Sequence, residues 1–307
     1  MFDRLGAKGK AIINFRHGSP GSWIAGWWRK SHNLHQPVAL ITGGSKGIGA
    51  ACVRKFVSAG WRVSVLTLAD GDPSWMTSMG VTVTAGDVTS SEAREAAVQR
   101  TLSSYGRIDV LINNAGVGLY AVPTEVSPVL FSRMLEVNVV APLALARLVI
   151  PVMLKQGAGT IVTMGSVAAR VALPWASAYS ASKSALLSIH DSLRVELRGT
   201  PIHLLGVYPG IVRTNFRDHV LAGEAPDRVR GISYVIPPDA LAAAIYRAIQ
   251  KGRSTLYLPA VGRFFGILGT FTPRLMDLYL ARMLSSAPLQ EPSAGARQTP
   301  KSADGSL

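Results

Sequence analysis

The chain has 307 residues, of which 48% are hydrophobic and 16% are charged, a composition that excludes a disordered protein and can bury a sizeable core. Its 32 lysines and arginines outnumber its 18 acidic residues, and the resulting net charge of +14 attracts phosphates, nucleic acids and anionic lipid surfaces alike. Because the sequence contains no run rich in Lys and Arg and no nucleic-acid motif, we expect no nucleic-acid partner.

Cysteine and histidine usage restricts the chemistry further. The single cysteine, Cys52, cannot form an internal disulfide or a cysteine metal cluster, so we expect a reducing compartment and place the protein in the cytoplasm. The six histidines are scattered, with no pair at the spacing of zinc ligands within a plausible helix, so we predict no metal site.

Residues 1–36 form a basic extension that contains tryptophan. Trp23, Trp27 and Trp28 lie close together in a segment with six lysines and arginines and one acidic residue, Asp3. No apolar stretch in it is long enough for the core of a signal peptide or for a membrane span. Two interpretations stay open: a loosely ordered extension, or a basic element that lies on an anionic membrane or acts as an organellar presequence.

From residue 37 to residue 260, short apolar runs alternate with segments of helix length. Strands are predicted over residues 38–41, 63–66, 81–85, 110–112, 160–164, 203–207 and 255–258. Helices are predicted over residues 48–59, 91–105, 124–154, 178–197 and 239–249. Strands that are apolar on both faces and separated by helices indicate a parallel sheet covered on two sides. The predicted fold class is therefore α/β: one Rossmann-type, doubly wound domain with seven parallel strands and an extension at each end.

The C-terminal extension has two parts. Residues 261–284 are apolar but interrupted by charges, and their longest uncharged stretch, 264–273, falls short of the roughly 20 residues that cross a bilayer. This segment is predicted to be an amphipathic element at a membrane interface, a lid over a hydrophobic substrate, or a subunit contact. Residues 285–307 are rich in Ser, Ala, Pro and Gln, which predicts a disordered tail.

A glycine-rich turn joins the first predicted strand to the first predicted helix. It reads Thr42-Gly43-Gly44-Ser45-Lys46-Gly47-Ile48-Gly49. Glycines permit a tight turn and let the backbone approach a pyrophosphate, while the helix N-terminus supplies unpaired N–H groups and the positive end of the helix dipole. At this junction of an alternating pattern, the turn indicates a dinucleotide site.

A Tyr–Lys pair carries the acid–base chemistry. Tyr179 and Lys183 are four residues apart and share one face of a predicted helix. An ammonium beside a phenol, together with an oxidised nicotinamide when that form is bound, favours the phenolate, so we expect the pKa of Tyr179 to fall below its usual value of about 10. Ser166 ends the fifth predicted strand, thirteen residues before Tyr179, and its hydroxyl can donate to a substrate oxygen. The nearby polar residues Ser180, Ser182 and His190 are assigned to packing or capping.

The T-G-x-x-x-G-x-G and Y-x-x-x-K spacings resemble the single-domain branch of the short-chain dehydrogenase/reductase family over about residues 37–260. Three further elements match: Asp87-Val88 after the third strand, Asn113-Asn114-Ala115-Gly116 after the fourth, and Pro209-Gly210 with Thr214 after the sixth. One residue departs from the pattern, because Gly165 stands where relatives often have a second Ser.

The resemblance implies an oxidoreductase in which Tyr179 moves a proton while a nicotinamide moves a hydride. The implied catalytic residues are Asn138, Ser166, Tyr179 and Lys183, with Asn138 holding a water that links Lys183 to solvent. Asn113 is expected only to brace the sheet. The implied cofactor-binding residues are Thr42, Gly43, Ser45, Lys46, Gly47, Ile48, Gly49, Thr67, Asp87, Val88, Asn114, Ala115, Gly116, Tyr179, Lys183, Pro209, Gly210, Val212 and Thr214.

The choice of cofactor depends on charge near the end of the second strand. NAD enzymes place an acidic acceptor there, but the residue twenty-five positions after Thr42 is Thr67. Lys46 can meet the 2′-phosphate of NADP(H) directly. Asp70 argues the other way because it can fold back towards the loop, and position 68 carries no arginine. We therefore predict NADP(H), with NAD(H) as the alternative.

Substrate specificity is expected from residues 167–178 and 211–236 and from the C-terminal segment. Val171, Leu173, Pro174 and Trp175 suggest an apolar wall, which favours a lipophilic carbonyl or secondary alcohol. We also expect a homodimer or homotetramer, with peripheral membrane contact as an open alternative to a purely cytoplasmic protein. A non-catalytic nucleotide-binding regulator remains an alternative, although the presence of the catalytic residues argues against it. A sugar-nucleotide epimerase or dehydratase is disfavoured, because neither T-G-x-x-G-x-x-G nor a long substrate domain is present.

Overall fold

The fold is seen in a computed structural model, which describes residues 36–70, 72–171, 173–216, 220–223 and 235–284. The predictions made for the basic extension (apart from Gln36) and for the tail at 285–307 therefore lie outside the described residues. So do parts of the predicted substrate loop, at 217–219 and 224–234.

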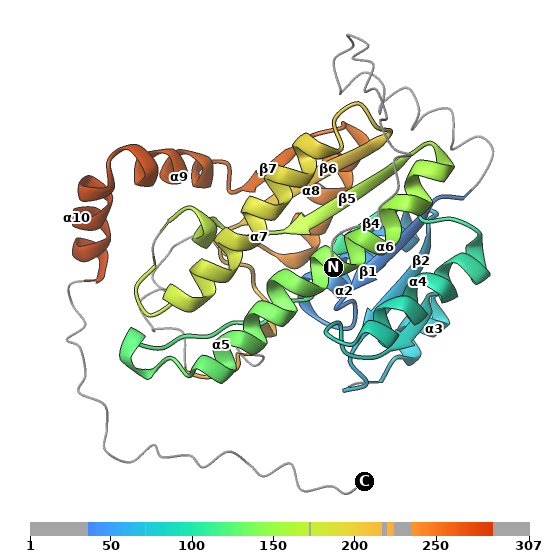
Figure 1. The fold of residues 1–307 in the computed structure, drawn as a ribbon, viewed down its shortest axis with the longest axis horizontal. Coiled ribbons are helices and arrows are strands. Elements are labelled where there is room, and N and C mark those ends of the chain that lie inside the picture. Colours follow the sequence, from blue (N-terminus) through green and yellow to red (C-terminus); the bar gives the residue numbers. More distant parts are fainter. Residues whose placement is uncertain (1–35, 71, 172, 217–219, 224–234, 285–307) are drawn as a thin grey trace, which may run out of the picture.

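A parallel sheet forms the centre of the protein (Figure 1). Its seven strands stand in the order β3-β2-β1-β4-β5-β6-β7, and all neighbouring pairs are parallel. Their bounds are β1 Val38–Thr42, β2 Arg62–Thr67, β3 Thr82–Ala85, β4 Val110–Asn113, β5 Gly159–Met164, β6 Ile202–Pro209 and β7 Thr255–Leu258. The sheet grows outward from β1 in one direction and from β4 in the other, which confirms the predicted doubly wound Rossmann-type fold.

Helices cover both faces of this sheet. They are α2 Gly47–Ser58, α3 Ser74–Ser78, α4 Ser91–Tyr105, α5 Pro128–Leu135, α6 Ala141–Gln156, α7 Ser177–Glu196 and α8 Pro238–Gln250. Successive strand residues face opposite sides: Ile41 belongs to the apolar cluster that contains residues of α2, α3 and α8, whereas Leu40 belongs to the cluster that contains residues of α4, α6 and α7. Helix α3 was not predicted, because five residues are too few to show a helical period. At its start, Asp72 accepts a hydrogen bond from Ser74 N at 2.8 Å, and the side chain of Met76 is buried beneath the helix.

The long predicted helix over 124–154 is interrupted in a specific way. A short 3-10 turn, η1 Pro123–Glu125, precedes α5, and a π turn, η2 Glu136–Val140, separates α5 from α6. Asn138 lies in this π turn. Hydrophobic spacing does not distinguish a π turn from an α-helix, so the π turn was not predicted.

The continuous helical stretch Pro128–Gln156 is, among the described residues, the one helix long and apolar enough to cross a membrane by length and composition. Half of its most apolar window is buried inside the protein. Leu145, Val149 and Met153 belong to the core on one face of the sheet. Packing in the core therefore accounts for the apolar composition of this helix.

The segment predicted at 261–284 consists of two helices, α9 Val261–Phe271 and α10 Pro273–Leu284. They follow β7 and project from one side of the body (Figure 1). Pro273 begins the second helix, consistent with the preference of proline for the first turn of a helix.

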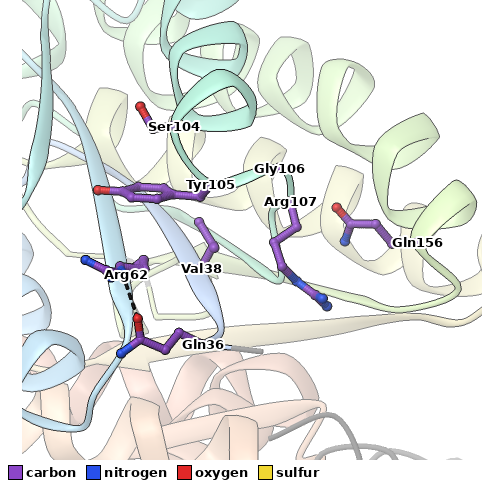
Figure 2. Close-up of a pocket in the computed structure, with 8 residues that line it drawn as sticks. All are labelled: Gln36, Val38, Arg62, Ser104, Tyr105, Gly106, Arg107 and Gln156. Atoms are coloured by element: carbon purple, nitrogen blue, oxygen red, sulfur yellow. Dashed lines mark hydrogen bonds between the residues drawn. The ribbon is translucent and has the colours of Figure 1, made fainter. Parts of the chain in front are cut away.

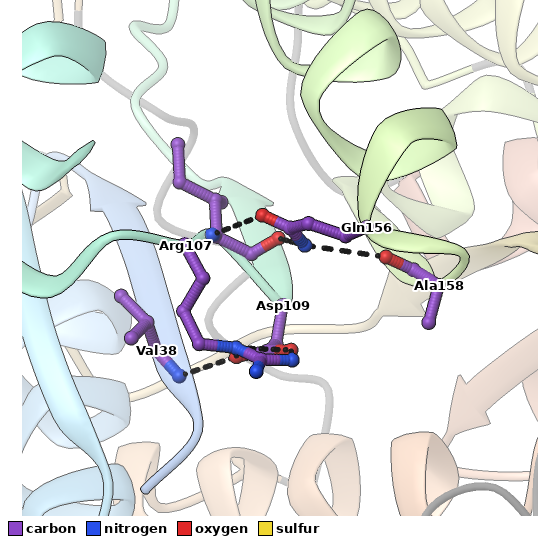
Figure 3. Close-up of polar contacts among 6 residues, drawn as sticks. Val38, Arg107, Asp109, Gln156 and Ala158 are labelled. Atoms are coloured by element: carbon purple, nitrogen blue, oxygen red, sulfur yellow. Dashed lines mark hydrogen bonds and ion pairs between the residues drawn. The ribbon is translucent and has the colours of Figure 1, made fainter. Parts of the chain in front are cut away.

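A buried carboxylate joins the amino ends of β1 and β4 (Figure 3). Asp109 accepts a hydrogen bond from Val38 N at 2.8 Å and pairs with the Arg107 guanidinium at 2.6 Å. Gln156, at the end of α6, accepts from Ile108 N and donates to Ile108 O, both at 2.9 Å. This network anchors the central strands at the end of the sheet opposite the strand carboxyl ends.

An open cavity of about 670 Å³ lies beside this network (Figure 2). Its lining residues include Gln36, Arg62, Tyr105 and Arg107, and Arg62 Nε donates to Gln36 Oε1 at 2.7 Å. Ligands of doubly wound sheets bind at the carboxyl ends of the strands. The cavity lies at the amino ends and is thus separate from the expected nucleotide site.

Replacing Asp109 with alanine removes the acceptor for Val38 N and leaves Arg107 without its carboxylate. We expect urea denaturation to show a loss of about 2–4 kcal/mol in the free energy of unfolding. Asp239→Ala is the control, because Asp239 forms an exposed ion pair with Arg54 at 3.1 Å and should cost less than about 1 kcal/mol. Equal losses for the two variants would show that the buried network adds no stability.

Candidate active site

The glycine-rich loop runs from the end of β1 into α2, as predicted. Gly43 has a φ of 65°, in the left-handed region that favours glycine. A Cβ at Gly49 would overlap the carbonyl oxygen of Gly43, so the loop closes on itself only with glycine at that position. Thr214 packs directly on this loop, since a Cβ at Gly47 would lie 3.3 Å from its side chain.

The N-terminus of α2 faces this loop. Lys46 occupies the N-cap position, but its side chain does not cap the helix. Its Nζ pairs with Asp70 Oδ2 at 3.2 Å, and both side chains are partly exposed. Thr67, at the end of β2, donates to Ser45 Oγ at 2.9 Å. The first-turn amides of α2 are thus left for an anion, and a lysine–aspartate pair lies beside them.

Asn114 ties the glycine-rich loop to the end of β4. Its Nδ2 donates to Thr42 O at 2.9 Å and to Gly43 O at 3.1 Å. Thr42 Oγ1 in turn accepts from Asn114 N and Ala115 N, both at 3.0 Å. Asn113 Nδ2 donates to Pro142 O at 3.3 Å, the bracing contact expected for that residue.

Asp87 follows β3 and is held by groups from two segments. Thr89 N donates to Asp87 Oδ1 at 2.8 Å, and Arg133 on α5 donates to the other carboxylate oxygen. Burial raises the pKa of this carboxyl, but the hydrogen bonds from Thr89 and the charge of Arg133 outweigh it, so the pKa is lowered. Val88 beside it is buried. Arg133 was missed from the sequence because it is 46 residues from Asp87.

The structure brings the four predicted catalytic residues together. Lys183 Nζ lies 5.8 Å from the centre of the Tyr179 ring and donates to Met164 O at 3.0 Å. Ser166 follows β5, and its hydroxyl acts on Tyr179 by lowering the pKa of the phenol. A Cβ at Gly116 would lie 3.1 Å from Asn138 Oδ1 and 3.4 Å from Lys183 Nζ, so both side chains come close to the backbone at Gly116.

Burial is the largest cause of the pKa shifts of Tyr179 and Lys183. It raises the pKa of the Tyr179 phenol, and Tyr120 adds to the rise, while the hydrogen bond with Ser166 opposes it. Burial also lowers the pKa of Lys183 to about 8. The predicted lowering of the phenol pKa is therefore wrong for this structure. The reason is that the lysine amino group points to Met164 O and is itself desolvated.

Asn138 braces the backbone next to Gly116. Its Oδ1 accepts from Val117 N and its Nδ2 donates to Val117 O, both at 2.9 Å. Nδ2 also donates to Ser182 Oγ at 3.0 Å, and Ser182 donates to Tyr179 O at 2.8 Å. The Asn138 side chain is thus engaged with protein groups, and its observed task is to hold Val117 and Ser182 in place. Ser182, predicted to pack or cap, belongs to this network.

Two aromatic rings flank Tyr179. The ring centres of Tyr120 and Phe216 lie 6.2 Å and 6.1 Å from that of Tyr179. The segment 220–223 pairs with residues 118–120, since Leu221 N donates to Gly118 O at 2.8 Å. These rings come from loops distant in sequence, and no motif pointed to them.

The remaining predicted residues lie in their expected surroundings. Gly210, after Pro209 at the end of β6, donates its N–H to Leu258 O at 2.8 Å. Val212 pairs with Ile236 through an isolated bridge. His190 is buried, with Nδ1 at 3.0 Å from Thr163 Oγ1, and burial lowers its pKa to about 4, which confirms its assignment to packing.

Gly165, which stands where relatives often have a second Ser, is explained by steric contacts. A Cβ there would lie 3.0 Å from two carbons of the Tyr208 ring and from Val207 O. Tyr208 is itself buried and stacks on Tyr257 with ring centres 4.7 Å apart. Glycine at 165 thus makes room for this pair of rings.

Metal and thiol chemistry have little support in the described part of the chain. No group of three or more His, Cys, Asp or Glu residues there is placed to hold a metal ion. Cys52 is buried, and burial raises its pKa to about 12, so it is not a reactive thiol.

A Rossmann-type sheet, a glycine loop between β1 and α2, and a Ser–Tyr–Lys–Asn cluster beside it define a nucleotide-dependent oxidoreductase. Comparison with known families agrees, because the family model described as short chain dehydrogenase matches residues 37–225. The chain belongs to the short-chain dehydrogenase family.

Three known proteins illustrate the similarity. Dehydrogenase/reductase SDR family member 7B of Bos taurus is 32% identical over 202 residues, which cover 62% of this chain and 62% of that protein, so the chain spans about three fifths of its length. The 2-(R)-hydroxypropyl-CoM dehydrogenase of Xanthobacter autotrophicus is 35% identical over 209 residues, covering 60% of this chain and 82% of that protein. A 3-ketoacyl-(acyl-carrier-protein) reductase from Brucella melitensis, solved with NADH, has a TM-score of 0.67 at 25% identity and covers 73% of this chain and 97% of its own.

The buried Lys183 makes stability depend on pH. Its folded pKa of about 8 lies below its ordinary value of 10.5, so the unfolded chain binds more protons between these values and stability rises with pH across this window. Between pH 8 and pH 10, the free energy of unfolding of the nucleotide-free protein should gain about 2 kcal/mol more than that of Lys183→Met. Urea unfolding at both pH values measures this difference. Equal gains would mean that the amino group is not desolvated in the folded protein.

Proposed function

We propose that the protein is an NADP(H)-dependent oxidoreductase that interconverts a carbonyl and a secondary alcohol on a hydrophobic substrate, with Tyr179 as the acid and base. The observation that carries this proposal is the buried amino group of Lys183 lying 5.8 Å from the centre of the Tyr179 ring, with Ser166 as a neighbour of the phenol. The names of two similar proteins support a carbonyl and an alcohol as the reacting groups. One is a 2-(R)-hydroxypropyl-CoM dehydrogenase and the other is a 3-ketoacyl-(acyl-carrier-protein) reductase.

The residues around the glycine loop fit a dinucleotide. The cradle is free of side chains at Gly43 and Gly49, and the N-terminus of α2 offers amide groups to a pyrophosphate. Asp87 and Val88 would hold the adenine end, while Gly116, Lys183 and Thr214 would hold the nicotinamide end. When bound, the nicotinamide supplies or takes up the hydride.

The phenol of Tyr179 would deliver the proton. Because burial raises its pKa, Tyr179 is protonated at neutral pH, the state that a carbonyl reduction requires. Ser166 would hold the substrate oxygen by donating a hydrogen bond to it. The amino group of Lys183 would then stabilise the phenolate left on Tyr179 by Coulomb attraction.

A hydrophobic substrate is supported by the side chains around Tyr179. Tyr120 and Phe216 flank its ring, and Leu221 packs in the same cluster. The backbone of Trp175 accepts a hydrogen bond from Ala121 N at 2.8 Å, which holds the predicted apolar loop against this cluster. Apolar groups here would bind a lipophilic ketone and exclude water from the reacting oxygen.

Replacing Tyr179 with Phe should lower turnover by about 10²–10⁴, because the variant keeps the ring and loses the proton donor. Binding of NADPH, followed by fluorescence titration, should remain. Turnover is measured with a panel of lipophilic ketones, and Tyr120→Phe serves as the matched control, with a loss below about tenfold. Near-normal turnover in Tyr179→Phe would remove Tyr179 from the mechanism. Absence of wild-type turnover across the panel, with NADPH bound, would favour a nucleotide-binding regulator.

The preference for NADP(H) rests on Lys46, and one observation favours NAD(H) instead. The Lys46 side chain lies at the start of α2, where its charge can meet a 2′-phosphate. Thr67 leaves the end of β2 without a carboxylate. However, Asp70 pairs with Lys46 at 3.2 Å, so its carboxylate lies near the same place and is able to accept from a ribose 2′-hydroxyl.

Two substitutions separate these cofactors. Lys46→Glu should raise the NADPH KM by about tenfold or more with a smaller effect on NADH, because it sets a carboxylate against the phosphate. Asp70→Asn should lower the NADPH KM several-fold by freeing Lys46, and leave the NADH KM unchanged. An increase in the NADH KM for Asp70→Asn, together with equal effects of Lys46→Glu on both cofactors, would identify the enzyme as NAD(H)-dependent.

A further inference from the structure

Helices α9 and α10 present a row of exposed apolar side chains. Phe264 is 59% exposed, Ile267 is 50% exposed and Phe271 is 80% exposed, and they are spaced three and four residues apart on one face of α9. On α10, which turns sharply away from α9 after Thr272 (Figure 1), Leu275 and Leu278 are also exposed, at 58% and 63%. We call these five residues the apolar stripe. Large apolar side chains exposed together at one end of a protein mark an interaction site.

The opposite face of α9 fixes the orientation of the stripe. A Cβ at Gly262 would lie 3.0 Å from Val167, and one at Gly266 would lie 3.1 Å from Arg170 Cβ. Gly262 and Gly266 are both buried. Close packing on the residues that follow Ser166 therefore holds α9 with its large apolar side chains turned away from the body.

The charges around the stripe have one dominant sign. Arg263, Arg274 and Arg282 are exposed on the same two helices, and Asp277 is the one acidic residue of the segment 261–284. By helical spacing, Arg274 shares a face with Leu278, four residues further on. Apolar side chains bordered by arginines are the pattern of helices that lie in an anionic membrane interface.

We propose that the apolar stripe docks the protein on the surface of an anionic lipid bilayer. The two helices have 11 and 12 residues, too short to cross a bilayer, so they lie in the plane of the headgroups. Charge favours this occupant over a second copy of the chain. A twofold contact through the same face would bring the arginines of both copies together, whereas acidic headgroups complement them.

The location of the stripe gives docking a consequence for the substrate. Helix α9 packs on η3 Val167–Ala169, which directly follows Ser166. A docked protein would therefore hold its active site next to the source of a lipophilic substrate. This consequence rests on the proposed function, whereas docking itself does not.

Vesicle binding of the full-length protein tests the proposal. The vesicles contain phosphatidylcholine with about one third phosphatidylserine, and phosphatidylcholine alone is the comparison. Phe264→Ser/Phe271→Ser should require about tenfold more lipid or more for half-maximal pelleting, and Arg263→Gln/Arg274→Gln should weaken binding to the anionic vesicles only. The matched control is Val129→Ser/Val195→Ser, since these valines on α5 and α7 are 76% and 64% exposed.

A fluorescent label locates the contact. Cys52 is buried, so Phe271→Cys offers the accessible thiol for an environment-sensitive dye. Its emission should shift to the blue with anionic vesicles, while the same dye on Val129→Cys should not respond. Pelleting of Phe264→Ser/Phe271→Ser like the wild type would overturn the proposal.

The docking proposal would also be overturned if the wild-type protein does not bind the vesicles and the Phe264→Ser/Phe271→Ser variant elutes from gel filtration at a lower mass than the wild type. That result would assign the stripe to contact with a second copy of the chain. None of the vesicle measurements uses turnover, so a failure of the proposed function would not be mistaken for a failure of docking.

Discussion

The burial of the Lys183 amino group is the constraint on which the site depends. Nζ lies between Met164 O, the backbone at Gly116 and the ring of Tyr179, and each contact requires a particular element: the end of β5, the turn after β4, and α7. The same dry surroundings lower the pKa of Lys183 and raise that of Tyr179. Burial thus keeps the phenol protonated, whereas it works against the charge of the lysine, whose pKa falls to about 8.

Much of this arrangement was predictable from the sequence. The period of the apolar runs predicted the seven strands to within two residues at each end, because strands buried on both faces leave a strong signal. The carboxyl ends of those strands meet at one edge, so motifs at the ends of β1, β4 and β5 had to converge. Local spacing also put Tyr179 and Lys183 on one helical face.

What the sequence did not reveal depends on contacts between distant segments. Arg133 and Asp87, or Phe216 and Tyr179, meet only after the chain has folded, and a single sequence carries no sign of such pairs. The direction of the Tyr179 pKa was missed for a related reason. Spacing within a helix indicates which charge is near, whereas desolvation depends on everything packed around it. The steric link between Gly165 and Tyr208 belongs to the same class, since it joins two neighbouring strands.

The π turn at Glu136–Val140 restricts insertions and deletions in this helical segment. Each residue of a helix turns the chain by about 100°, so one inserted or deleted residue rotates everything beyond it. On one side of the turn, Met134 packs in the cluster around Tyr179; on the other, Leu145 packs beneath the sheet. Surface loops tolerate insertions and deletions, but a change of one residue between these two positions would move either the core or the active site out of register.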